Sequence, residues 1–263
     1  MGIPSKVAKQ LWLFSVTVTL LIGAAPARAD WTKSEYTSGG QPVEVYACAP
    51  ESKRPHPAVI LIHGAEVHGA GYHNLEQVCG DLAAQGYYAE MIEYYGPGEE
   101  VVPGEQSKIR QSFAGWVRKL HDGLDALDKN HEVDSKRIAV MGYSLGAMLA
   151  LSLGARYSDQ IAAVVDYYGP IPPSVQEKAA TMPPTLIIHG GKDRLVLAQQ
   201  SQELDQILTA AARPHQLKLY PEAEHAFNFE DSNAYDANDT QAAWTVTLDF
   251  LAQYLKGNSP DAH

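Results

Sequence analysis

The chain contains the stretch Arg137-Ile-Ala-Val-Met-Gly-Tyr-Ser-Leu-Gly-Ala147, in which an apolar run leads into a Gly-x-Ser-x-Gly turn. Ile138 to Met141 predict a buried strand, and apolar residues after the turn recur at helical spacing. A serine at such a turn has a strained backbone and an exposed hydroxyl, and only small residues fit two positions to either side. Gly142 and Gly146 meet that requirement, so the stretch predicts Ser144 as a candidate nucleophile. The other interpretation is an ordinary strand-to-helix turn bounded by glycines.

Strand-like and helix-like segments alternate on both sides of this stretch. Strands are predicted at 43–47, 57–63, 87–92, 161–166, 185–189 and 216–220, and the run at 57–63 is continuously apolar. Amphipathic spacing predicts helices at 72–85, 109–127, 196–212 and 240–256, with loops at 94–106 and 169–184. The alternation predicts an α/β fold, with a doubly wound, mostly parallel sheet and helices on both faces. One domain over residues 30–256 is expected, followed by a disordered tail at 257–263.

The first 29 residues have the pattern of a secretory signal peptide. Lys6 and Lys9 precede an apolar run at 11–22, and Ala27-Arg28-Ala29 places small residues where a signal peptidase cleaves. The alternative is an uncleaved membrane anchor, but the run is shorter than the roughly 20 residues that span a bilayer. We therefore expect cleavage after Ala29 and a periplasmic or secreted protein without stable membrane insertion.

The charge of the chain is strongly acidic. The formal net charge is −11, and removal of Lys6, Lys9 and Arg28 with the signal would lower it to −14. A surface of that charge repels phosphate backbones and anionic lipids. We expect neither nucleic acid nor a membrane as a partner, and the charge itself is explained by solubility.

The two cysteines allow two interpretations. Cys48 falls in a strand-like stretch and Cys79 in a helix-like one. An exported compartment permits a disulfide between them, but two buried free thiols agree equally well with the sequence.

A nucleophilic serine needs a base, and the base needs a group that fixes its tautomer. In folds with this type of turn, the partners follow the serine in the order Asp or Glu, then His. Asp193 follows the predicted strand at 185–189, and His225 follows the strand at 216–220. Both lie at the carboxyl ends of strands, where active sites of open α/β sheets lie. These positions predict Asp193 as the orienting carboxylate and His225 as the base.

Acyl transfer also needs donors for the developing oxyanion. We expect one from the backbone N–H of Leu145, at the start of a helix, and a second from the N–H of Ala65, in the loop after the strand at 57–63. His63, His68 and His73 lie in the same region, but their spacing and the absence of nearby Cys do not favour a metal site. No dinucleotide or phosphate loop is evident, so no cofactor is expected.

Several motifs together resemble the dienelactone hydrolase family of α/β-hydrolases over residues 40–256. They are His63-Gly-Ala-Glu66-Val-His-Gly69, Gly142-Tyr-Ser-Leu-Gly146, Tyr167-Tyr-Gly169, His189-Gly-Gly-Lys-Asp193 and Tyr220-Pro-Glu-Ala-Glu-His-Ala-Phe227. The resemblance implies hydrolysis of a small-molecule ester or lactone through an acyl-enzyme, without a cofactor. It also implies that Ser144, Asp193 and His225 form the triad and that Glu66 contacts the resting nucleophile.

Two positions depart from the pattern of the family's namesake enzymes. Ser144 stands where those enzymes have Cys, and Phe229 stands where they have an Arg that holds the substrate carboxylate. Dienelactone is therefore a doubtful substrate. Related functions remain open: a peptidase or acyl-aminoacyl hydrolase of the same fold, or a non-catalytic binding protein.

Aromatic residues gather in the loops expected at the strand ends. They are Tyr94, Tyr95, Tyr167, Tyr168, Phe227 and Phe229. They could form an apolar wall around the substrate or pack in the core, and Arg110 or Arg194 could supply a cation. The sequence leaves the acyl group, the alcohol and the oligomeric state open.

Overall fold

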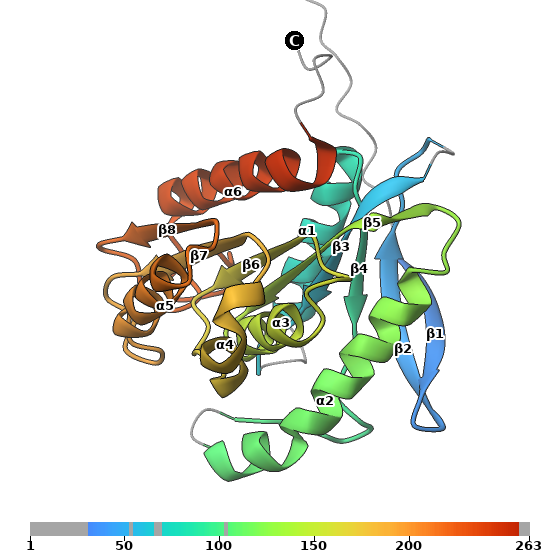
Figure 1. The fold of residues 1–263 in the computed structure, drawn as a ribbon, viewed down its shortest axis with the longest axis horizontal. Coiled ribbons are helices and arrows are strands. Elements are labelled where there is room, and N and C mark those ends of the chain that lie inside the picture. The colour runs from blue at the N-terminus through green and yellow to red at the C-terminus, as the bar shows by residue number, and fades with distance from the viewer. Residues whose placement is uncertain (1–30, 53–54, 66–69, 103–104, 258–263) are drawn as a thin grey trace, which may run out of the picture.

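One sheet of eight strands forms the centre of the molecule. The computed structural model describes residues 31–52, 55–65, 70–102 and 105–257. The strands are β1 (Thr32–Ser38), β2 (Gln41–Cys48), β3 (His56–Ile62), β4 (Tyr88–Ile92), β5 (Val133–Tyr143), β6 (Ala163–Tyr167), β7 (Thr185–Gly190) and β8 (His215–Tyr220), in the order β1-β2-β4-β3-β5-β6-β7-β8 (Figure 1). Strands β3 to β8 are parallel to one another, and β1 and β2 pair antiparallel at one edge.

Helices cover both faces of this sheet (Figure 1). They are α1 (Ala70–Ala84), α2 (Gln106–Leu127), α3 (Leu145–Arg156), α4 (Pro173–Lys178), α5 (Gln199–Ala210) and α6 (Ala237–Leu251), which continues as a π-helical turn (Ala252–Lys256). Because side chains alternate along a strand, Val140 packs with α2 to α5 on one face, whereas Met141 packs with α1 and α6 on the other. The predicted α/β-hydrolase fold, with its doubly wound and mostly parallel sheet, is confirmed.

Three elements were not predicted from the sequence. β1 was missed because nearly all of its side chains are exposed, so this edge strand has no apolar pattern. The prediction of a loop throughout 169–184 is wrong, since α4 and a 3₁₀ turn (Ala179–Thr181) lie within it. Pro173 is the first residue of α4. At this position an N–H would have no acceptor within the helix, so proline costs no hydrogen bond, and its fixed φ suits a helix.

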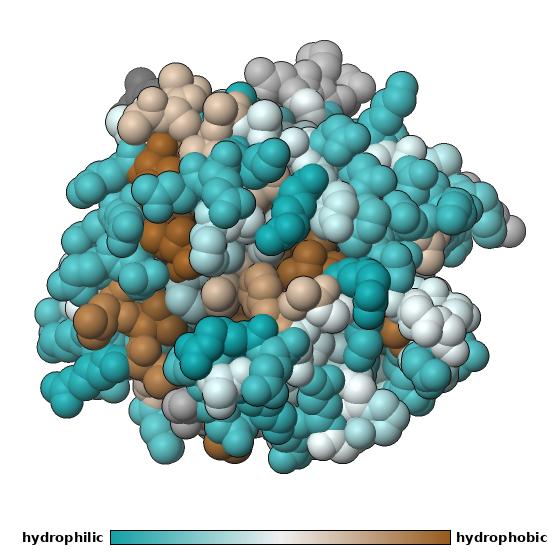
Figure 2. Space-filling view, turned by 60° about the horizontal axis from the view of Figure 1, so that its bottom comes forward, coloured by the Kyte–Doolittle hydropathy of each residue, from teal (hydrophilic) through white to brown (hydrophobic). Residues whose placement is uncertain are grey.

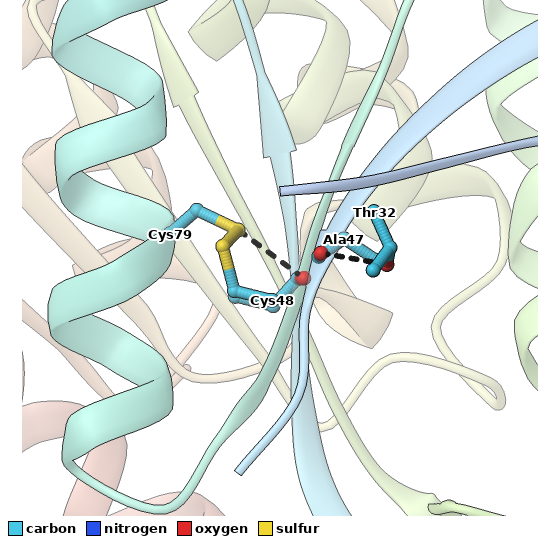
Figure 3. The surroundings of a disulfide bond; sticks show 5 residues. Thr32, Ala47, Cys48 and Cys79 are labelled. Atoms are coloured by element: carbon cyan, nitrogen blue, oxygen red, sulfur yellow. Dashed lines mark hydrogen bonds between the residues drawn. A yellow bond between two sulfur atoms is a disulfide. The ribbon is translucent and has the colours of Figure 1, made fainter. Parts of the chain in front are cut away.

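Cys48, at the end of β2, forms a disulfide with Cys79 on α1 (Figure 3). Their Cα atoms are 5.7 Å apart, and both residues are fully buried. Of the two interpretations of the cysteines, the disulfide is therefore the one that the structure has, and not two free thiols. It ties α1, which carries residues of the cavity described below, to the sheet.

The predicted signal peptide lies outside the described residues, as do residues 258–263 of the expected tail. None of the helices in the described ranges is long and apolar enough to cross a bilayer.

Candidate active site

Ser144 lies in the sharp turn between β5 and α3. Its φ of 54° and ψ of −116° fall outside the regions that L-residues normally occupy. A Cβ at Gly142 would overlap the backbone of Gly146, and a Cβ at Gly146 would overlap the backbone of Ile62. The sequence therefore folds into this turn because glycine occupies both crowded positions, as predicted.

The hydroxyl of Ser144, the imidazole of His225 and the carboxylate of Asp193 form one hydrogen-bonded chain. His225 Nε2 lies 3.0 Å from Ser144 Oγ, and His225 Nδ1 lies 2.7 Å from Asp193 Oδ2. A carboxylate only accepts, so Nδ1 carries the proton and Nε2 of the neutral ring accepts from the serine. The structure thus brings together the three residues that the sequence predicted, although 81 positions separate Ser144 from His225.

Asp193 is buried and accepts several hydrogen bonds. Its Oδ1 accepts from the backbone N–H groups of Leu195 and Val196, at 2.8 and 2.9 Å, and its Oδ2 also lies 3.3 Å from His189 Nε2. Burial opposes ionisation, but the hydrogen bonds to His189 and His225 outweigh it and hold the pKa of Asp193 well below its ordinary range. Asp193 is therefore a carboxylate throughout the neutral range.

His189 is a contact of Asp193 that the sequence interpretation did not assign. It is fully buried in β7, and its Nε2 also lies 2.8 Å from the carbonyl oxygen of Val196. The signal was present, since His189 precedes Asp193 by four residues in the His-Gly-Gly-Lys-Asp motif. The spacing alone does not reveal the contact, because it is the turn after β7 that brings the carboxylate of Asp193 back to the ring of His189.

A cavity of about 440 Å³ opens beside Ser144 and His225. Aromatic rings of Tyr143, Tyr168 and Phe229 line it. Of the six aromatic residues predicted to surround the substrate or to pack in the core, Tyr168 and Phe229 therefore border this cavity. Tyr94, Tyr95, Tyr167 and Phe227 are buried and do not line it.

The charges around the cavity are negative. Glu224 and Asp231 line it and are exposed, and no Lys or Arg of the described ranges does so. The two arginines considered as substrate ligands, Arg110 and Arg194, are exposed and lie outside this lining. Figure 2, coloured by hydropathy, shows a mainly hydrophilic face with apolar areas between the hydrophilic ones.

Strained backbone is concentrated at this cavity. Four non-glycine residues of the described ranges have φ between +47° and +58°. Ser144, Tyr168 and Ala226 line the cavity, and only Ala212 lies elsewhere. Such conformations cost free energy and persist where the surroundings enforce them, commonly at functional sites.

The predicted oxyanion donors lie next to the serine. Leu145 is the first residue of α3, so its N–H has no acceptor within the helix, while its side chain is buried in the core. Ala65 lines the cavity, and a Cβ at the preceding Gly64 would lie 3.6 Å from Ser144 Cβ. Glu66, the predicted contact of the nucleophile, lies outside the described residues.

Of the three histidines considered as metal ligands in the sequence, only His63 has a described side chain. His63 is buried, lines the cavity and stacks on Tyr94, whereas His68 and the side chain of His73 are not described. Elsewhere, His121, Asp122 and Asp125 group closely, but Asp122 already accepts from Ser38 and Asp125 from Gln160. We assign no metal to either place.

Solved structures with the same fold include hydrolases of two kinds. A candidate dienelactone hydrolase from Klebsiella pneumoniae superposes with a TM-score of 0.75 and 24% identity, covering 85% of this chain and 98% of that one. An acylaminoacyl peptidase from Pyrococcus horikoshii has a TM-score of 0.71 and 14% identity, but the match covers 43% of that chain. Both likenesses show the fold.

Proteins with similar sequences identify the family to which the chain belongs. A Yersinia pestis protein named as a candidate carboxymethylenebutenolidase is 30% identical over 239 residues, which cover 82% of this chain and 86% of that protein. An Escherichia coli K12 protein of the same name is 27% identical, covering 82% and 84%. Residues 43–255 match the profile described as "Dienelactone hydrolase family". The resemblance drawn from the motifs is confirmed, and the chain belongs to the dienelactone hydrolase family and is a hydrolase.

Proposed function

We propose that the protein is an exported serine hydrolase that cleaves carboxylic esters or lactones through an acyl-enzyme. The observation that carries the proposal is the chain of hydrogen bonds from Ser144 through His225 to Asp193. Ser144 Oγ attacks the ester carbonyl while its proton passes to His225 Nε2, and Asp193 stabilises the resulting imidazolium. The N–H groups of Leu145 and Ala65 stabilise the oxyanion of the tetrahedral intermediate.

The intermediate collapses when His225 returns its proton to the leaving alcohol, which departs and leaves the acyl group on Ser144. Water then attacks this second ester, again with His225 as the base. The carboxylic acid leaves, Ser144 regains its proton and the enzyme is restored.

A burst experiment tests this function. Mixing the protein with excess p-nitrophenyl acetate should release about one equivalent of p-nitrophenol faster than the steady state, wherever deacylation limits the rate. Release no faster than spontaneous hydrolysis, in burst and steady state alike, would favour a non-catalytic binding protein instead.

We further propose that the preferred substrates carry no carboxylate. An anion that leaves water needs a compensating cation, and the described lining offers Glu224 and Asp231 but no Lys or Arg. Phe229, four residues after His225, contributes an apolar ring instead. Neutral short-chain aryl or alkyl esters should then have kcat/KM at least about tenfold above that for dienelactone, after correction for intrinsic reactivity.

Phe229→Arg tests the assigned role of Phe229. The new guanidinium can pair with a substrate carboxylate, so the ratio of kcat/KM for dienelactone to that for p-nitrophenyl butyrate should rise at least about tenfold. Val102→Arg, at an exposed position outside the cavity lining, is the matched control for added charge. An equal rise in both variants, or none in Phe229→Arg, would show that Phe229 does not control this selectivity.

Export is proposed from the signal pattern at 1–29, and the Cys48–Cys79 disulfide supports it because such bonds persist in oxidising compartments. The full chain should be recovered from the periplasm or medium of a bacterial host with its N-terminus at Asp30. Retention in the cytoplasm with an intact N-terminus would contradict export without bearing on the hydrolase activity.

A further inference from the structure

The segment from His63 to Ala65 carries a proposed oxyanion donor but lies beyond the regular sheet. Pairing of β3 with β5 ends at Ile62, so strand hydrogen bonds no longer fix the chain there. A donor for an oxyanion must nevertheless be held in position before the reaction. Some other contact has to set the direction of the Ala65 N–H.

We infer that Tyr94 and Tyr95 are positioning residues, whose hydroxyl groups orient the backbone of this oxyanion loop. The inference rests on the proposed function and assigns residues that act through Ala65 rather than on the substrate. The hydroxyl of Tyr94 donates to the carbonyl oxygens of His63 and Gly64, at 3.1 and 3.3 Å. The hydroxyl of Tyr95 donates to the carbonyl oxygen of Ala65 at 3.2 Å.

Peptide geometry links these carbonyls to the donor. The carbonyl of Gly64 and the N–H of Ala65 belong to the same planar trans peptide and point in opposite directions. Holding Gly64 O therefore fixes the direction of the Ala65 N–H. Gly64 O also accepts from His63 Nδ1 at 2.7 Å, so two donors hold this one peptide plane. The bond from Tyr95 fixes the following peptide plane.

The two tyrosines are themselves firmly held. Tyr94 is fully buried, stacks on the His63 ring at 4.0 Å and contacts Trp116 edge-on. Tyr95 is 6% exposed and packs against the rings of Tyr94 and Trp116. Burial raises the pKa of both phenols well above the ordinary value, so both hydroxyls remain donors at neutral pH.

Tyr94→Phe is the main test, because it removes the hydroxyl and keeps the ring. Measured per site that reacts with a fluorophosphonate, kcat for p-nitrophenyl acetate should fall about tenfold or more, and KM should change little. The rate of phosphonylation should fall in parallel. The Ki of a trifluoromethyl ketone, which forms an oxyanion on the enzyme, should rise by a similar factor. Tyr95→Phe should show the same pattern with a smaller effect.

Tyr36→Phe is the matched control. The Tyr36 hydroxyl donates to the carbonyl oxygen of Lys119 at 2.6 Å and does not line the cavity, so its loss should lower thermal stability but leave kcat unchanged. If Tyr94→Phe behaves like Tyr36→Phe, the inference is overturned. If Tyr94→Phe does not fold, an unchanged kcat and Ki in Tyr95→Phe overturns it. Wild-type protein that never reacts with the phosphonate would instead contradict the proposed function itself.

Discussion

Replacing Ser144 with alanine is expected to lower kcat for p-nitrophenyl butyrate by a factor on the order of 10⁶. The variant loses the proposed nucleophile, and with it the covalent route. Hydrolysis above the spontaneous rate can then come only from binding and from the oxyanion donors. The fold should persist, because alanine is smaller and the Ser144 hydroxyl has a hydrogen-bond partner only in His225 among the contacts described.

Ser152→Ala is the control for the loss of a serine. Ser152 is buried on the same helix, α3, and its hydroxyl contacts Ser174 rather than the cavity residues. Its alanine variant should keep kcat within about twofold of the wild type, since nothing places its hydroxyl near the reacting ester. A folded Ser144→Ala protein that retains more than about a tenth of the wild-type kcat would exclude Ser144 as the nucleophile.

Asp193→Asn is expected to lower kcat by a factor on the order of 10⁴ while the protein remains folded. The amide that replaces the carboxylate can donate to Nδ1 of His225, which favours the tautomer with its proton on Nε2. That tautomer cannot accept the proton of Ser144. The amide also fails to stabilise the imidazolium that forms in the transition state. Steady-state kinetics with p-nitrophenyl butyrate measure the effect.

Asp134→Asn provides the comparison. Asp134 lies near the amino end of β5, pairs with Arg137 at 2.7 Å and, like Asp193, has a lowered pKa, with hydrogen bonds and charge outweighing burial. Its variant should keep full activity. A similar small loss of kcat in both variants would remove Asp193 from the proposed triad.

The same carboxylate gives a stability signature. The pKa of Asp193 is lower in the folded state than in the unfolded state, so its ionisation stabilises the protein above the unfolded pKa of about 3.9. This contribution is lost as the pH falls toward the folded pKa. Asp193→Asn should therefore lose less stability than the wild type on acidification below pH of about 4, as measured by chemical denaturation.

Local pattern was sufficient to predict most of the fold and the three residues of the proposed triad. The apolar run before Ser144 and the glycines beside it specify the turn, because the crowding at Gly142 and Gly146 is a property of the turn itself. Asp193 and His225 could be predicted because each follows a parallel strand, the buried β7 and the edge strand β8, and the carboxyl ends of such strands lie at one edge of the sheet.

Contacts between distant segments could not be predicted in this way. The hydroxyl of Tyr94 reaches a carbonyl 31 positions earlier in the chain, and only the pairing of β3 with β4 brings the two loops together. The Cys48–Cys79 bond likewise depends on how α1 packs on β2. β1 was not predicted because this exposed edge strand has no apolar face. Its pairing with β2 holds it in place.

Covalent trapping shows directly whether Ser144 is the nucleophile. The wild-type protein is treated with a fluorophosphonate until its esterase activity is lost, and the modified peptide is then identified by mass spectrometry. We expect one phosphonyl group per chain, carried by Ser144, and the fraction of chains labelled should equal the fraction of activity lost. Complete inactivation with Ser144 unmodified, or a single adduct on another residue, would contradict it.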